Sequence, residues 1–283
     1  MNPTAAAIRA GWTRGLIELR QSFTNGADLW AHFFWPVLML IVTFFLRNVS
    51  FGHGGFLLGT LVLPSIVGMN VAVGMISMSQ QLTADREDGT LLRAKATPNG
   101  MLGYLVGKII SVSGGLVADL AIFLVPGMFI IRGLAVSSLG SWLTLIWVLV
   151  LGLVASLPIG VVLGSVFSSA RAQGLITLPM LGLIAVSGIF YPIASMPGWL
   201  QWIAQGFPMY WLGLGMRSAL LPGSAVSVEI GYSWRHLETI GVLVHLGLNR
   251  FPLGSKRLAL VGPLEGLGHG AVVVGDEVKH LAR

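Results

Sequence analysis

Long apolar segments separated by short polar ones dominate this sequence. Five of them approach or exceed the roughly 20 residues that an α-helix needs to cross a bilayer. They cover residues 29–47, 57–82, 101–131, 139–167 and 172–191. Because each ends at charged residues or at Gly and Pro turn signals, the pattern predicts an all-α membrane protein. We expect five transmembrane helices, within a membrane domain at residues 28–250.

Residues 1–27 have a helical rather than a continuous apolar pattern. Apolar side chains recur every three or four residues, and Arg9, Arg14 and Arg20 lie off that stripe; the stripe consists of Ile8, Trp12, Leu16, Leu19 and Phe23. This predicts an amphipathic helix in the membrane interface, with a soluble N-terminal arm as the alternative. The apolar run that follows is longer than a signal-peptide core and lacks a small-residue cleavage site, so we expect it to be an uncleaved span.

The second half of the sequence is less regular. Residues 192–222 are interrupted by prolines and rich in aromatic residues, which predicts short re-entrant helices at the outer interface. A sixth apolar segment begins at residues 237–249 but stops after about ten residues, half the length of a span. Residues 251–283 are Gly-rich and mixed in charge, and we expect an atypical, disordered tail. A reading-frame shift near Val244 is our hypothesis for this truncated sixth helix.

Composition supports the membrane class. Hydrophobic residues make up 54% of the chain and charged residues 10%, against about 25% charge in soluble proteins. The net charge of +6 does not indicate a nucleic-acid partner, because the basic residues lie between apolar runs. The chain has no cysteine, which excludes disulfides and thiolate metal sites.

The basic residues also predict orientation. With a cytoplasmic N-terminus, the inner segments hold Arg9, Arg14, Arg20, Arg86, Arg93, Lys95, Lys108 and Arg171, whereas the outer segments hold Arg47, Arg132, Arg217 and Arg235. Eight basic residues in the inner segments against four in the outer segments favour that orientation under the positive-inside rule. We therefore expect a multi-pass plasma-membrane protein in contact with lipid, with its N-terminus in the cytoplasm.

A charged connector follows the second predicted span. Acidic residues come first, at Asp85, Glu87 and Asp88, and basic residues follow at Arg93 and Lys95. This order suits the dipole of a short helix. A solvated loop whose charges only keep it out of the lipid is the alternative.

Two other features lie within the apolar segments. Small residues recur every four positions at Gly152, Ser156, Gly160 and Gly164, which indicates close helix packing, with a substrate or dimer role as the alternative. Asp119 lies near the middle of its span, where it is either a counter-charge on a cargo path or a hydrogen-bonded structural residue.

The sequence gives little support for a metal site or a catalytic site. No paired ligand spacing occurs among the histidines, which are His32, His53, His236, His245, His269 and His280. No clustered acid, base and nucleophile emerges either. The segment from Gly103 to Ile109 lacks the glycine spacing and the hydroxyl of a phosphate-binding loop, so the chain is not expected to be an ATPase.

Two stretches carry a family resemblance. The connector, followed by Thr97-Pro98 and Gly107-Lys108, resembles the cytoplasmic loop of ABC-2 type transporter permeases, and the daunorubicin-resistance drug-efflux permeases look most similar. Residues 187–192, followed by Met196-Pro197, Trp199-Leu200, Pro208 and Arg217, resemble the segment after the fifth span of that family.

The resemblance implies an ABC-2 exporter-like bundle that works as a homodimer with two copies of a cytoplasmic ATPase subunit. ATP and magnesium would bind to that partner, and this chain would carry no cofactor. A coupling helix at residues 83–92 would contact the ATPase through Asp85, Arg86, Glu87, Asp88, Gly89, Thr90, Leu91 and Leu92. An extracellular gate would involve Tyr191, Pro192, Pro197, Trp199 and Pro208, although an ordinary aromatic belt is the alternative.

The expected function is ATP-driven export of a hydrophobic small molecule, such as a drug or antibiotic, which would make the chain part of a multidrug efflux system. Export of a polysaccharide or lipid-linked glycan is the alternative within the family. A proton-driven secondary transporter using Asp119 and an integral membrane enzyme are alternatives from other classes.

Overall fold

The computed structural model describes residues 2–51, 56–131, 133–135, 138–167, 169–187 and 193–250. This part of the chain is an all-α bundle with one short antiparallel hairpin, formed by β1 (Ser50–Phe51) and β2 (Phe56–Leu57). The predicted all-α membrane fold is therefore confirmed. The expected tail at residues 251–283 lies outside the described residues.

Four described helices are long and apolar enough to cross a membrane: α2 (Gly26–Leu46), α3 (Leu58–Glu87), α5 (Gly100–Ile130) and α6 (Leu139–Val166). They correspond to the first four predicted spans. The fifth and sixth apolar helices are shorter, at 17 residues for α7 (Ala170–Val186) and 15 residues for α10 (His236–Arg250). The predicted end of the fifth span, at residues 188–191, lies outside the described part.

Polar caps define where several helices begin. The side chains of Asn2, Asn25, Ser138 and Ser169 accept hydrogen bonds from the first-turn backbone N–H groups of α1 (Pro3–Ser22), α2, α6 and α7. Those N–H groups have no partner within the helix. The short polar connections between the apolar runs thus fix the start of each helix.

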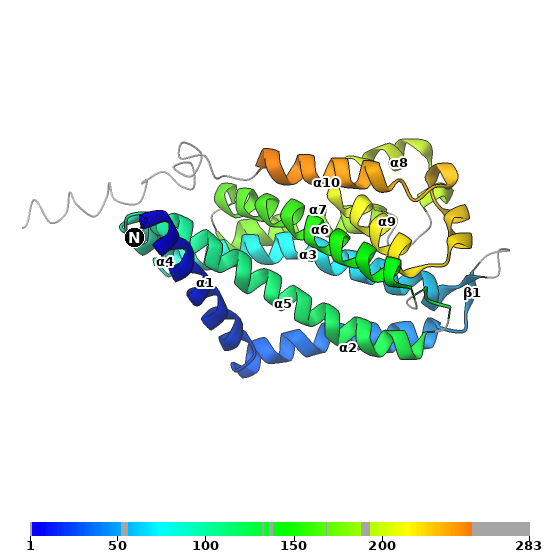
Figure 1. The fold of residues 1–283 in the computed structure, drawn as a ribbon, viewed down its shortest axis with the longest axis horizontal. Helices are drawn as coiled ribbons and strands as arrows, with labels where there is room; N and C mark the ends of the chain where they lie inside the picture. The colour runs from blue at the N-terminus through cyan, green and yellow to red at the C-terminus, as the bar shows by residue number, and fades with distance from the viewer. Residues whose placement is uncertain are drawn as a thin grey trace, which may run out of the picture. The chain divides into compact units, whose positions relative to one another are not determined.

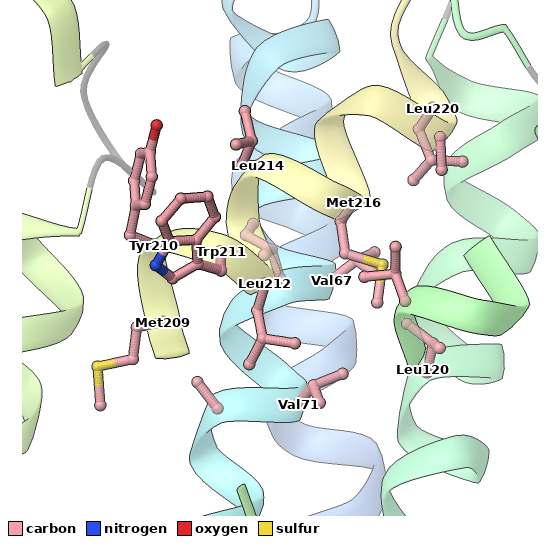
Figure 2. Close-up of a cluster of buried hydrophobic side chains, with 14 of the residues drawn as sticks. Val67, Val71, Leu120, Met209, Tyr210, Trp211, Leu212, Leu214, Met216 and Leu220 are labelled. Atoms are coloured by element: carbon pink, nitrogen blue, oxygen red, sulfur yellow. The ribbon is translucent and has the colours of Figure 1, made fainter. Parts of the chain in front are cut away.

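Helix α3 lies at the centre of the bundle and packs against α2, α5, α6, α7 and α9 (Pro208–Leu220). Figure 2 shows side chains of α9 beside Val67 and Val71 of α3, and Leu120 of α5 belongs to the same apolar core. Helix α9 approaches α3 closely where both helices have a glycine. A Cβ atom at Gly68 would lie only 2.9 Å from the Cα atom of Gly213. The predicted re-entrant segment therefore includes a helix buried inside the bundle.

The two ends of the bundle differ (Figure 1). The short helix α4 (Thr90–Lys95) and the start of α1 lie at one end, here called the α4 end, and the β1–β2 hairpin lies at the other, the hairpin end.

Helix α1 packs against the half of α5 nearest the α4 end. Cβ atoms at Gly11 and Gly15 would lie 2.3 Å and 2.5 Å from the carbonyl oxygens of Gly103 and Gly107. The first three residues of the α1 apolar stripe are exposed, namely Ile8, Trp12 and Leu16, whereas Leu19 and Phe23 are half-buried against the bundle. This arrangement leaves the first part of the stripe available to lipid, as an interfacial helix requires.

Candidate functional site at the α4 end

The connector between α3 and α5 is built around a sharp turn. Helix α3 continues to Glu87, Gly89 adopts the left-handed conformation with φ 75°, and α4 begins at Thr90. The expectation of one helix over residues 83–92 is therefore wrong, because a left-handed residue ends a helix, and glycine adopts that conformation without a Cβ penalty. The backbone N–H of Thr90 donates to a carboxylate oxygen of Asp88 over 2.8 Å, which starts α4.

The expected coupling residues divide between an outer and an inner side. Glu87, Asp88 and Leu92 are exposed, and the exposed fraction of Leu92 is 55%. Leu91 is 2% exposed and anchors α4 to the rest of the bundle. Thus the end of α3 and the start of α4 together present a mixed charged and apolar outer surface on a fixed base.

Asp85 points inward, into a group of five side chains that we call the charge ring: Arg14, Glu18, Asp85, Tyr104 and Lys108. The Nζ atom of Lys108 lies 2.8 Å from Asp85 Oδ2 and 3.1 Å from Glu18 Oε2. Tyr104 donates its hydroxyl to Asp85 over 2.7 Å, and Arg14 pairs with Glu18 over 2.8 Å. The Arg14 guanidinium lies 5.3 Å from the Tyr104 ring centroid, which closes the ring. Two cations and two anions thus balance one another between α1, α3 and α5.

The opposite side of α3 carries an uncharged group that we call the amide clamp: Ser79, Thr83 and Gln173, with the Phe167 carbonyl. The Gln173 amide nitrogen donates to Thr83 Oγ1 and to the Phe167 carbonyl, each over 2.9 Å. Its amide oxygen accepts a bond from Ser79 over 3.0 Å. All three side chains are buried. The clamp therefore joins α3 to the turn between α6 and α7.

Arg86 adds another contact from α3 to α6. Its guanidinium donates to the Ser165 carbonyl over 3.4 Å, at the C-terminal end of α6, where cations are favoured. Burial lowers the pKa of Lys95, and the positive charge of Arg86 lowers it further. For Asp88, the hydrogen bonds from the Thr90 hydroxyl and then from its backbone N–H lower the pKa of the carboxyl group.

Asp119 has a specific partner within the chain. Its Oδ1 atom lies 2.5 Å from Nδ1 of His32 on α2, and Nε2 of His32 lies 3.3 Å from the Ser22 hydroxyl. Phe23 stacks on the imidazole with a centroid distance of 4.4 Å. Nothing in the sequence pattern indicated that this acid, base and hydroxyl are neighbours. Because the Ser22 hydroxyl donates to the Leu19 carbonyl, the geometry is that of a polar link between helices.

The small-residue ladder of α6 lies against α3 and α9. A Cβ atom at Gly152 would meet Leu212 at 2.3 Å, one at Gly160 would meet the Met75 carbonyl oxygen at 2.4 Å, and one at Gly164 would meet the Ser79 carbonyl oxygen at 2.8 Å. The fourth member, Ser156, is completely buried. These positions serve packing within one chain in this structure.

The expected gate residues are only partly described. Tyr191 and Pro192 lie outside the described residues, and Pro197 precedes α8 (Gly198–Gln205). Trp199 is 64% exposed, whereas Pro208 is the buried first residue of α9. A buried pair of Arg217 with Glu229 holds the end of α9 to the segment that follows.

No group of three or more potential metal-ligating residues occurs in the described ranges. His236 lies 6.0 Å from the Trp147 ring, centroid to centroid. His53, His269 and His280 are outside those ranges.

Several residues at this end of the bundle were not predicted from the sequence. Glu18, Tyr104 and Gln173 were not singled out, and Lys108 was used for orientation and for the family resemblance but was given no partner. Lys108 and Gln173 could have been found, because a polar residue inside an apolar segment usually has an internal partner.

Residues 42–248 match the model of a family described as ABC-2 family transporter protein. The match covers more than half of the chain and includes all of α3 to α9. The comparison with curated proteins gave no match.

Proposed function

Because the chain belongs to the ABC-2 family of transporter proteins, we propose that it is the permease subunit of an ATP-driven exporter whose ATPase is a separate cytoplasmic protein. Family membership and the four long apolar helices make the chain a multi-pass membrane transport component. In this proposal the α4 end and the N-terminus face the cytoplasm.

The outer surface of α4 is the observation that supports an ATPase contact. Leu92 is exposed there, beside the exposed Glu87 and Asp88 at the end of α3, and an apolar side chain next to polar ones fits the apolar centre and polar rim of a protein interface. The left-handed Gly89 and the buried Leu91 hold that surface in one position. A docked ATPase could therefore displace α4 and α3 together, and α3 lies at the centre of the bundle.

We further propose a hydrophobic small-molecule cargo, such as a drug or antibiotic, and a homodimer that binds two ATPase subunits. The resemblance to drug-efflux permeases supports the cargo class. ATP and magnesium would bind to the partner. Export of a lipid-linked glycan is the alternative within the same family.

Two exposed leucines at opposite ends of the bundle provide the test. Leu92 on α4 is 55% exposed, and Leu237 near the start of α10 is 85% exposed. We expect Leu92→Ala to weaken ATPase co-purification by about fivefold to tenfold, because an apolar contact at an interface contributes about 1 kcal/mol or more. Leu237→Ala should leave co-purification unchanged, and both variants should insert in the membrane normally.

If both variants co-purified equally with the ATPase, Leu92 on α4 would not be part of the interface. Transport in reconstituted vesicles that ignores ATP and follows a proton gradient would contradict the proposed function as a whole.

A further inference from the structure

The last turns of α3 carry polar side chains on two sides, and each side joins a different pair of helices. Asp85 enters the charge ring with α1 and α5, whereas Ser79 and Thr83 enter the amide clamp with α6 and α7. We propose that Lys108 and Gln173 are positioning residues that transmit a displacement of α4 along two separate branches. This inference rests on the proposed function, because it assumes that an ATPase displaces α4.

The first branch depends on Lys108. Its side chain is 9% exposed, and its ammonium group bridges a carboxylate of α3 and a carboxylate of α1. A buried charge that loses its counter-charge is strongly unfavourable. The carboxylates and the ammonium group therefore move together, and a shift of α3 draws α1 and α5 with it.

The second branch depends on Gln173. Its amide makes three hydrogen bonds, two to α3 side chains and one to the Phe167 carbonyl just after α6. The clamp contains no charge, and its buried polar groups satisfy one another, so its separation would leave several of them without partners. A shift of α3 therefore also reaches the turn between α6 and α7.

Both branches begin close to the proposed ATPase contact. Thr83 and Asp85 are two residues apart in one continuous helix, and that helix ends at Glu87. Helix α4 follows after a single left-handed residue and is anchored by the buried side chains of Leu91 and Ala94. Because these residues are so close along the chain, we expect α4 and the end of α3 to move together.

Each branch can be removed without leaving a stranded charge. Lys108→Met alone would leave Asp85 without its ammonium partner, so it is combined with Asp85→Asn, which keeps an oxygen acceptor for the Tyr104 hydroxyl. Gln173→Leu is combined with Thr83→Val for the second branch. Gln201→Leu is the matched control, because Gln201 also donates to a carbonyl, that of Met196 over 2.8 Å, but on α8.

Spin labels can report the two branches separately, since the chain has no cysteine of its own. One labelled pair uses Arg93→Cys on α4 with Thr13→Cys on α1, and the other uses Arg93→Cys with Gly174→Cys on α7. We expect Lys108→Met/Asp85→Asn to broaden only the α4–α1 distance distribution in pulsed electron–electron double resonance. Thr83→Val/Gln173→Leu should broaden only the α4–α7 distribution, and Gln201→Leu should broaden neither.

Transport is the second readout. In complexes with the ATPase, both double variants should keep ATP turnover but lose at least about fivefold in cargo moved per ATP, as expected for loss of a coupling free energy. Unchanged distance distributions, or equal broadening of both distances by both variants, would overturn the two-branch inference. Absence of ATP-dependent transport in the wild-type complex would contradict the proposed function instead, and the spin-label result would still decide whether the branches exist.

Discussion

Helices α2 and α3 contain equally apolar stretches that have opposite surroundings. Their most apolar 18-residue windows have mean hydropathies of 2.0 and 1.9, yet 11% of the α2 window is buried in the chain against 72% of the α3 window. Lipid tails and protein interiors are both apolar, so hydropathy cannot distinguish a helix that faces lipid from one that faces other helices.

Side-chain size distinguishes the two helices. Helix α2 exposes large aromatic side chains, among them Trp30, Trp35 and Phe45. Helix α3 buries glycines, and a Cβ atom at Gly74 would lie 2.4 Å from a methyl carbon of Leu116. Because dispersion contacts hold membrane helices together and need close approach, small residues mark the faces that other helices cover.

Gly160→Leu should have the largest effect on stability, because it fills a face that α3 covers. The new side chain would start 2.4 Å from the Met75 carbonyl oxygen and 2.8 Å from the Met78 Cβ atom, so backbone atoms of α3 or α6 must move. We expect a loss of about 3 kcal/mol or more in the free energy of unfolding. Thermal unfolding in detergent, monitored by size-exclusion chromatography, would show this loss as a lower unfolding temperature.

Gly182→Leu on α7 is the matched control. A Cβ atom there would have no neighbour within 4 Å, and we expect the unfolding temperature to remain close to that of the wild type. If both variants were equally destabilised, the close fit of α6 on α3 would not be the reason for the small residue at position 160.

The sequence predicted these features unevenly. Apolar length identified the four long helices, and four-residue spacing identified the small face of α6, because both signals are local. Nothing local indicated that the small face meets α3. The charge ring combines residues from α1, α3 and α5, and the distance between Lys108 and Glu18 depends on how those helices pack. The turn at Gly89 was also missed, although a glycine between acidic and basic residues is a recognisable signal for a helix end.

Helix α2 stays attached to the bundle although most of its surface is exposed, and substitutions of Asp119 can show whether the contact with His32 is the reason. Asp119→Leu would leave His32 without its carboxylate partner at 2.5 Å, and loss of a partner by a hydrogen-bonding group that is largely shielded from water costs about 1 kcal/mol. We expect a lower unfolding temperature and weaker cross-linking between cysteines placed on α2 and α5. Asp119→Asn keeps an oxygen acceptor and should recover most of the loss.

The two variants also separate the two roles of Asp119. A stable Asp119→Asn variant that still exports neutral cargo but fails to export cationic cargo would favour a counter-charge on the cargo path. An Asp119→Leu variant as stable as the wild type would show that the contact between Asp119 and His32 does not hold α2.

The smallest effect is expected at Asp88, beyond the apolar part of α3. Hydrogen bonds from Thr90 lower the pKa of its carboxyl group in the folded protein, so the ionised form stabilises the turn at neutral pH. That contribution is present above the pKa of the unfolded chain, about 4, and is lost as the pH falls through the lower folded value. Asp88→Asn keeps an oxygen acceptor for the Thr90 N–H, so at pH 7 we expect the unfolding temperature to fall by less than about 2 °C. The difference between variant and wild type should shrink further at pH 3, and thermal unfolding at both pH values would show it. A loss as large as that of Gly160→Leu, or one that grows on acidification, would mean that the end of α3 depends on its charge as strongly as its apolar part depends on close packing.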